Sequence, residues 1–534
     1  MQGRQRRWIA LTVLLGWVVW GAMTPADALA QVDVLTYHND LERTGQNLFE
    51  TVLTPANVGP ATFGRLYTRP VDGYVYAQPL YVSGLAIPGQ GTHDVVYVAT
   101  ENDTVYAFDA TGTPRRALWK RRLIVPHTGG RAVKSSETGC EDLVPKIGVT
   151  STPVIDRANS TLYVVAKTKE KGAGNFVQRL HALDLATGAE KLGGPVVISA
   201  TVAGTGDGSD GTMISYDPLR QHQRSALALV KGVVYISSAA HCDIGPYHGW
   251  MIGYHANDLS FASAYVTTPD GGLGGVWESG GAPAADTDGN LYVETGNGTF
   301  DANTAGNDYG DSLLKLTPAG ATLDVADYFT PFNQDDLNQA DTDFGSGGPL
   351  LLPDQPGAHQ REVIACGKEG SIYLVDRDAM GHFHPGDDSQ IVQSLPDEIG
   401  GTWSSPAYWN GRVYYSGAGD SLKAFALTNG LLSASPVASA PDGFGFPGAT
   451  PSISANDNSD GIVWTLQTDG YADGQPAVLH AYAASDVSQV LYASNQNGRH
   501  DVAGKAVKFA VPTIANGRVF VGTQKRLTAY GLHS

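Results

Sequence analysis

The chain has few charged residues, only three cysteines and no long apolar run after its first thirty residues. Lys, Arg, Asp and Glu make up 16% of the 534 residues, which is too few for a disordered polyelectrolyte. Acidic residues outnumber basic ones by 53 to 35, and no Lys/Arg run occurs in the body of the chain. Nucleic acid is therefore not an expected partner. A membrane-spanning helix is excluded there too, because it needs about 18 consecutive apolar residues.

The first thirty residues have the pattern of an export signal. Three arginines precede an apolar run over residues 8–23, and Ala-Leu-Ala at residues 28–30 closes the segment. The context of the arginine pair favours the general secretory route over the twin-arginine route. We predict a signal peptide at residues 1–30 and a periplasmic or secreted protein. In that compartment the cysteines, at 140, 242 and 366, allow one disulfide and leave one thiol.

Glycine and proline are abundant. The 65 glycines and 29 prolines interrupt any long helix, and they show no collagen-like period. The composition therefore predicts an all-β chain of many short strands.

A short motif, in which a small residue and a proline begin a strand, occurs eight times at an average spacing of about 62 residues. A second apolar strand follows each copy, and a third follows most copies. In one copy Ala226 takes the place of the proline. The copies are QPLYV from Gln78, STPVI from Ser151, SALAL from Ser225, GAPAA from Gly281, GGPLL from Gly347, SSPAY from Ser404, ATPSI from Ala449 and AVPTI from Ala510.

Units of three or four short antiparallel strands cannot bury both faces alone, and closing them into a ring protects their edges. We predict an eight-bladed β-propeller of four-stranded antiparallel blades over residues 61–534, after an N-terminal extension at 31–60. The last unit ends after its third strand, so Phe63–Val71 is predicted to supply the outer strand and close the ring. An open solenoid is disfavoured because the units are too long and no capping segment is visible.

Two stretches resemble the repeat of propellers that bind pyrroloquinoline quinone (PQQ). They are TVYAFDATG, from Thr104 to Gly112, and HALDLATG, from His181 to Gly188. The resemblance covers nearly the whole chain after residue 30 and implies the fold of the PQQ-dependent alcohol dehydrogenases, the quinoprotein family. The same repeat also builds non-catalytic scaffold propellers, so the function depends on the site residues.

The segment from residue 274 to 298 is similar to the dehydrogenase segment that holds the quinone and calcium. The resemblance implies that Trp277 forms the floor beneath the quinone and that Asn297 binds calcium, tasks that suit an aromatic face and an amide oxygen. The stretch AGNDYGDSLLKL resembles the segment of the catalytic aspartate. It implies that Asp308 takes the proton of the alcohol and contacts calcium, with Asp311 as the alternative. Blade packing and turn formation are the ordinary interpretations of these residues.

Four further positions match the family pattern. Lys368 stands where a cation contacts the quinone oxygens, and Trp403 resembles a later tryptophan beside the cofactor. Asp243 takes the position of a calcium-binding glutamate, although its shorter side chain limits bidentate binding. Lys146 stands where an arginine faces the cofactor carboxylates, so it keeps the charge and loses the bidentate fork.

Cys140 matches the region in which the dehydrogenases carry two adjacent cysteines over the cofactor. Gly139 precedes it here, so that ring cannot form. The resemblance implies that the segments of Cys140 and Cys242 converge above the site. We therefore predict a disulfide between them and a buried free thiol at Cys366.

These matches predict an exported quinoprotein-like oxidoreductase that oxidises an alcohol or sugar hydroxyl with PQQ and calcium. The chain has no CxxCH haem motif, so an external acceptor such as a soluble cytochrome would take the electrons. Two alternatives stay open. One is a carbohydrate-cleaving propeller that uses His241 or His248 with Tyr247 and no redox cofactor, and the other is a non-catalytic binding scaffold. The polar segment Tyr37–Asn47 is expected to be a solvated strap, or else to bring charged groups near the pocket.

Overall fold

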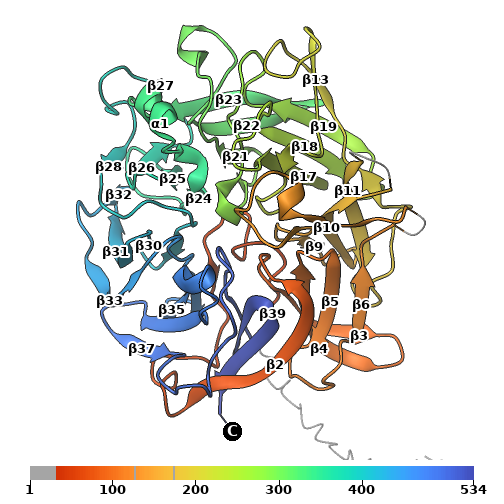
Figure 1. The fold of residues 1–534 in the computed structure, drawn as a ribbon. Helices are drawn as coiled ribbons and strands as arrows, with labels where there is room; N and C mark the ends of the chain where they lie inside the picture. The colour runs from red at the N-terminus through yellow and green to blue at the C-terminus, as the bar shows by residue number, and fades with distance from the viewer. Residues whose placement is uncertain (1–31, 126–127, 172–174, 534) are drawn as a thin grey trace, which may run out of the picture.

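The computed structural model describes residues 32–125, 128–171 and 175–533, and the predicted signal peptide lies outside them. Eight small antiparallel sheets are arranged in a ring (Figure 1), which confirms the predicted eight-bladed β-propeller. Within those ranges no helix is long and apolar enough to cross a membrane.

The first four blades each consist of four sequential strands joined in antiparallel order. In each of them the first strand begins one or two residues after the proline position of its motif, a position that Ala226 occupies in the third blade. The strands are β3 (Leu80–Ile87), β4 (Gly91–Thr100), β5 (Thr104–Asp109) and β6 (Trp119–Arg122); β9 (Val154–Asp156), β10 (Thr161–Lys169), β11 (Phe176–Asp184) and β12 (Val196–Val197); β16 (Ala228–Val230), β17 (Val233–Ala240), β18 (Trp250–His255) and β19 (Phe261–Val266); β20 (Ala284–Ala285), β21 (Leu291–Glu294), β22 (Leu313–Ala319) and β23 (Thr322–Thr330).

The remaining blades repeat this order up to the last one, whose sheet is β38-β39-β2. Their strands are β24 (Leu350–Leu351), β25 (Glu362–Cys366), β26 (Ile372–Asp376) and β28 (Gln393–Leu395); β29 (Ala407–Trp409), β30 (Arg412–Ser416), β31 (Asp420–Thr428) and β33 (Ala438–Phe444); β34 (Ser452–Asn456), β35 (Ser459–Gln467), β36 (Val478–Ala483) and β37 (Val490–Ala493); β38 (Thr513–Ala515), β39 (Arg518–Leu532) and β2 (Phe63–Tyr74).

Short strands, 3-10 turns and one helix lie outside the four-stranded blades. A two-stranded sheet, β13-β14, stands apart from the blades, and the single α-helix of the described ranges is α1. These elements are β1 (Gln46–Asn47), β7 (Arg131–Lys134), β8 (Lys146–Ile147), β13 (Thr201–Ala203), β14 (Met213–Ser215), β15 (Gln221–His222), β27 (His382–Phe383), β32 (Leu431–Leu432), α1 (Gln334–Ala340) and the 3-10 turns η1 (Ser135–Glu137), η2 (Glu278–Gly280), η3 (Ala302–Thr304), η4 (Phe344–Ser346) and η5 (Asp469–Tyr471).

An N-terminal strand closes the ring, as predicted. Strand β2 pairs antiparallel with the end of β39, with Phe63 opposite Leu532, and the two strands lie side by side in Figure 1. The pairing ties the beginning of the described chain to its end, so the last blade has no free edge at this position.

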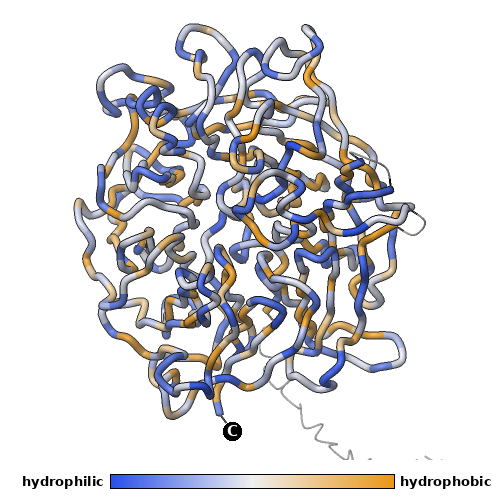
Figure 2. Tube along the Cα trace, viewed as in Figure 1, coloured by the Kyte–Doolittle hydropathy of each residue, from blue (hydrophilic) through white to orange (hydrophobic). Residues whose placement is uncertain are grey.

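The core is divided among the interfaces between blades. Apolar side chains of neighbouring blades form separate buried clusters, because each sheet packs both of its faces against its neighbours. Strand β5, for example, is buried along its whole length. Figure 2 shows apolar segments all around the ring and not in one part of it.

The polar segment before β2 is buried, so the expectation of a solvated strap was wrong. His38 and Arg43 are both fully buried. The guanidinium of Arg43 donates to the carbonyls of Pro283, Tyr37 and Asp40 and to the Thr36 hydroxyl, so its charge is satisfied inside the protein.

This segment, residues 32–50, hydrogen-bonds to the first strands of most blades. Backbone bonds join it to six residues that each lie two positions after a motif proline, and the Asn47 side chain makes the equivalent bond to the Ile514 carbonyl. The strap thereby connects seven blades. The six residues are Tyr81, Ile155, Ala285, Leu351, Tyr408 and Ile453.

Candidate functional site

A cavity of about 560 Å³ lies where loops of several blades meet. Five of the nine residues predicted for catalysis or for binding the cofactor and metal line it, although they are far apart in the chain, and other residues join them. Pockets of roughly 300–1,000 Å³ hold small ligands and cofactors in proteins. The five predicted lining residues are Cys140, Asp243, Trp277, Lys368 and Trp403.

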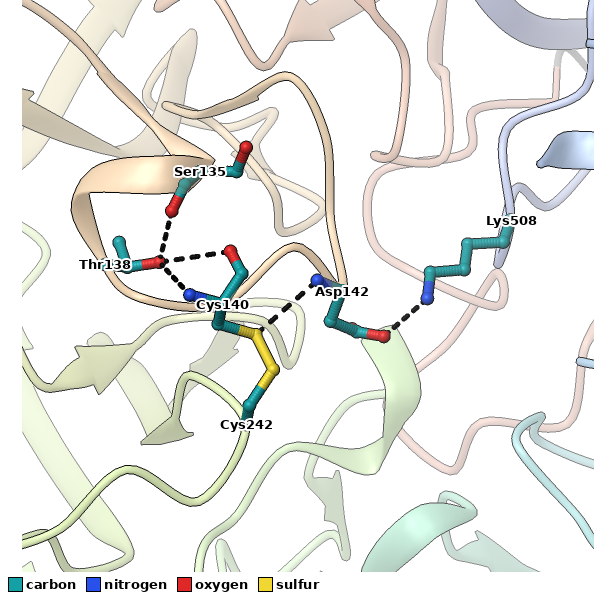
Figure 3. The surroundings of a disulfide bond; sticks show 6 residues. All are labelled: Ser135, Thr138, Cys140, Asp142, Cys242 and Lys508. Carbon is teal, nitrogen blue, oxygen red and sulfur yellow. Dashed lines mark hydrogen bonds and ion pairs between the residues drawn. A yellow bond between two sulfur atoms is a disulfide. The ribbon is translucent and has the colours of Figure 1, made fainter.

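A disulfide forms part of the cavity wall. Cys140 and Cys242 are bonded across 102 positions of sequence, with their Cα atoms 5.7 Å apart, which confirms the predicted pairing. In Figure 3 the Cys140 loop also reaches Lys508, because Asp142 accepts a hydrogen bond from that ammonium group. The loop is therefore held on both sides. Cys366 is the buried free thiol, as predicted.

The rings around Lys508 make one side of the cavity aromatic. Its ammonium group lies 5.1–5.6 Å from the ring centres of Phe446, Tyr471 and Phe509. Trp403 packs edge-on against Phe446, with 5.0 Å between the ring centres. These contacts give this wall an apolar surface with one covered cation.

The opposite part of the cavity is acidic and centres on Lys368. Its Nζ atom lies 2.8 Å from a carboxylate oxygen of Asp343, 2.9 Å from one of Asp341, and 6.0 Å from the ring centre of Trp277. Burial opposes the charge on Lys368, but Asp343 and Asp341 outweigh burial and raise its pKa. The lysine is therefore held charged beside the face of the tryptophan.

Asn297 connects both of these carboxylates. Its backbone N–H donates to Asp343 at 2.9 Å and its Nδ2 donates to Asp341 at 2.8 Å. The Oδ1 atom of Asn297 is buried and has no hydrogen-bond partner among the described residues. A buried acceptor without a donor is costly, so this oxygen suits a cation or water.

Burial raises the pKa of Asp343, and Asp243 raises it further, although Lys368 and the N–H of Asn297 act in the opposite direction. The Asp243 carboxylate accepts a hydrogen bond of 2.6 Å from the hydroxyl of Tyr247. Within the described ranges, no three or more His, Cys, Asp or Glu side chains are arranged to hold a metal ion. The oxygen donors therefore have the chemistry of a hard-cation site, but their side chains do not converge as a preformed one.

Four predicted residues are not part of the cavity lining: Asn297, which lies behind it against Asp343, and Asp308, Asp311 and Lys146. Asp308 accepts a hydrogen bond from the backbone N–H of Asp270. Asp311 is buried and accepts from the N–H of Phe344, and burial followed by the charge of Asp343 raises its pKa well above the usual value. Lys146, in β8, donates to the side chain of Asn102. An arginine does line the cavity, but it is Arg224 and does not occupy the position of Lys146.

The histidines named for the carbohydrate-cleaving alternative are separated by the fold. His241 and Tyr247 line the cavity, whereas His248 does not. Both ring nitrogens of His248 are engaged, with the Thr268 hydroxyl and the Asp207 carbonyl. His248 is therefore held as a structural residue and has no ring nitrogen left for proton transfer.

The sequence reasoning missed Asp341 and Asp343. They form the stretch Asp-Thr-Asp just before η4 and the fifth proline motif. The sequence feature that could have identified them is the pair of carboxylates, two positions apart, directly before a copy of the motif. Asp341 has a φ of 53°, as Cys242 and Asp243 have φ values of 50°, so several cavity residues occupy the left-handed region that side chains disfavour.

No known sequence family and no curated protein matches this chain. Solved structures do match it in fold. A quinohemoprotein alcohol dehydrogenase from Comamonas testosteroni superposes with a TM-score of 0.58 at 15% identity, covering 93% of this chain and 80% of that one. The quinohemoprotein alcohol dehydrogenase ADHIIG from Pseudomonas putida HK5 gives 0.59 at 16%, covering 94% and 80%. A europium-containing methanol dehydrogenase gives 0.58 at 12%, covering 94% and 98%.

Proposed function

We propose that the protein binds PQQ and a metal ion in this cavity and oxidises an alcohol or sugar hydroxyl. The supporting observation is that Trp277, Lys368 and the Cys140–Cys242 disulfide line one cavity large enough for a small cofactor. Solved structures with this fold include quinohemoprotein alcohol dehydrogenases and a methanol dehydrogenase, which agrees with the proposal.

The residues fit a planar, electron-accepting ligand. Trp277 offers an aromatic face, and Lys368 offers a partly buried positive charge 6.0 Å from the centre of that ring. When bound, the quinone would accept the electron pair of the alcohol, and the metal ion would act as a Lewis acid. Lys368 would orient oxygen atoms of the ligand through charge-assisted hydrogen bonds.

Asp343 is the carboxylate that we assign as the general base, in the role first expected of Asp308. Its pKa is raised, mainly by burial, which brings the group closer to the pKa that proton transfer near neutral pH requires. Lys368 and the N–H of Asn297 hold its oxygens in fixed positions. Asp341 also contacts Lys368, but its side chain is 70% exposed, so water competes for its hydrogen bonds. Asp341 is therefore the weaker candidate for the base.

The metal would be held by oxygen atoms of Asp243 and Asn297, with Asp343 left free to accept the proton. The unpartnered Oδ1 of Asn297 supports this assignment, because it is a buried acceptor that a hard cation would satisfy. Calcium is the metal that we propose. Europium belongs in the test because one of the similar structures is named for it.

The protein would deliver its electrons to an external acceptor such as a soluble cytochrome, because the sequence has no CxxCH haem motif. The export-signal pattern of residues 1–30 supports a periplasmic or secreted location.

The test starts with residues 31–534 mixed with PQQ and either calcium or europium. Quinone absorbance that stays with the protein through gel filtration, and dye reduction with a panel of alcohols and sugars, are the expected results. Asp343→Asn should retain the quinone and lower kcat by about 100-fold or more. Asp335→Asn, an exposed carboxylate of α1, is the matched control and should behave as wild type.

The pH dependence follows from the same assignment. Protonated Asp343 cannot accept a proton, so kcat should rise as the pH increases through its raised pKa, and this limb should disappear in Asp343→Asn. If Asp343→Asn retained both the quinone and full activity, Asp343 would not be the general base. No retained quinone with either metal would remove the proposal, and sugar cleavage without quinone would favour the hydrolytic alternative.

A further inference from the structure

Two buried basic side chains near the cavity have no carboxylate partner within the described ranges. Arg224 and Lys167 are 3% and 2% exposed, and neither takes part in an ion pair within 4.0 Å. Holding a positive charge away from water without a counter-ion is strongly unfavourable. Such groups call for an explanation, and a bound anion would supply one.

Lys167 extends from β10 to the ring of His241. Its Nζ atom is 2.6 Å from Nε2 of His241, and it also donates to the carbonyls of Leu219 and Gln221. The three partners match the three donors of an ammonium group. His241 lines the cavity, so the charge of Lys167 lies one side chain behind the wall.

His222 completes the connection to Arg224. The rings of His222 and His241 are stacked with centres 4.2 Å apart, and both line the cavity. Burial, together with the nearby charges of Lys167 and Arg224, lowers the pKa of His222 well below its usual value. Burial also lowers the pKa of His241 well below its usual value, so the two imidazoles are neutral hydrogen-bonding groups between Lys167 and Arg224.

Arg224 is fixed at the cavity wall by backbone contacts. Its Nη1 donates to the Thr150 carbonyl and its Nη2 to the Ser279 carbonyl, which leaves further donors of the guanidinium without partners in the described structure. Gly280 permits this position, because a Cβ atom there would approach Nη1 to 2.5 Å. We call these four side chains the cationic row: Lys167, His241, His222 and Arg224.

We propose that the cationic row is an anion subsite that binds carboxylate groups of the ligand, an inference that rests on the proposed function because PQQ is the carboxylate ligand tested. Lys146, the residue first expected in this role, lies outside the cavity wall. The row takes its place with different residues.

The contact between Lys167 and His241 couples binding to protonation. A charged Lys167 donates to Nε2, which places the ring proton of His241 on Nδ1 as a donor. A neutral Lys167 instead accepts from Nε2–H, which leaves Nδ1 as an acceptor. An anion beside Nδ1 favours the first state, so binding should draw a proton onto Lys167.

The sign of this effect can be measured. Burial lowers the pKa of Lys167 to about 7, opposed by Asp217, and the other titratable or charged groups near it are the remaining members of the row. At pH 8 the empty site is therefore mostly neutral at Lys167, and an anion raises its pKa again. Calorimetry in buffers of different ionisation enthalpy should detect proton uptake on binding at pH 8 and little at pH 6.

The experiment compares PQQ with its trimethyl ester, which lacks the anionic groups, using quenching of tryptophan fluorescence without substrate. Wild type should bind PQQ at least about tenfold more tightly than the ester. Arg224→Met and Lys167→Met should each weaken PQQ binding by about tenfold or more, and Lys167→Met should abolish the proton uptake. Lys169→Met, two residues along β10 and paired with Glu137, is the matched control.

The outcomes separate this inference from the function. Equal binding of PQQ and ester, with unaffected variants, would overturn the anion subsite and leave the proposed function standing. Failure of wild type to bind either compound would overturn both. If Lys167→Met does not fold, judged by thermal unfolding, His241→Gln tests the same coupling, and retained proton uptake in that variant would contradict it.

Discussion

Phe63, at the start of β2, lies opposite Leu532 near the end of β39, and its ring fills the space between the last two blades. It packs within 5.0–6.3 Å of the rings of Trp464, Tyr492 and Tyr530. The seam of the propeller is therefore closed by backbone pairing and by a buried aromatic cluster.

Phe63→Ala tests the seam. The ring is fully buried, so its removal leaves a cavity and should lower the free energy of unfolding by about 3–5 kcal/mol. Leu66→Ala, in the same strand but 39% exposed, should cost much less. Urea unfolding followed by tryptophan fluorescence measures both, and equal losses would show that the seam is held by strand pairing alone.

Ring closure could be predicted from the repeats, and the disulfide from the family resemblance, which implied that the segments of Cys140 and Cys242 converge. The motif copies marked each blade, and the missing outer strand followed from the order of strands. The strap could not be predicted, because its contacts are backbone hydrogen bonds to residues such as Tyr81 and Ile453 that leave no side-chain signal. Asp343 was missed because its role depends on a loop of one blade approaching the Trp277 loop of another.

Arg43→Met tests the strap. The buried guanidinium bonds to four residues, and its loss leaves the Pro283 carbonyl without its two donors. We expect the free energy of unfolding to fall by about 2–4 kcal/mol. Arg499→Met, at an exposed position, is the control and should fall within about 0.5 kcal/mol of wild type. If Arg43→Met left the free energy of unfolding unchanged, the strap would not contribute to the stability of the ring.

The Cys140–Cys242 bond should stabilise the fold by limiting the unfolded chain. It closes a segment of 102 positions, so the Cys140→Ser, Cys242→Ser double variant should lose about 2–5 kcal/mol. Thiol titration in denaturant should give one thiol per chain before reduction and three after it. Cys366→Ala should abolish the thiol seen before reduction, and three reactive thiols in the unreduced protein would refute the bond.

Glu278, next to Trp277, should make the protein less stable as the pH rises. Burial raises its pKa from 4.5 to about 8, although Ser225 and the N–H of Glu294 lower it partly. Between these values the folded protein holds a proton that the unfolded chain releases, so stability is full below about pH 4.5 and falls as the pH rises to 8. Glu278→Gln keeps the shape and removes the titration. Urea midpoints at pH 5 and pH 8 should therefore differ less in this variant than in wild type, and an unchanged difference would place the pH dependence on other groups such as Glu294, whose pKa is also raised by burial.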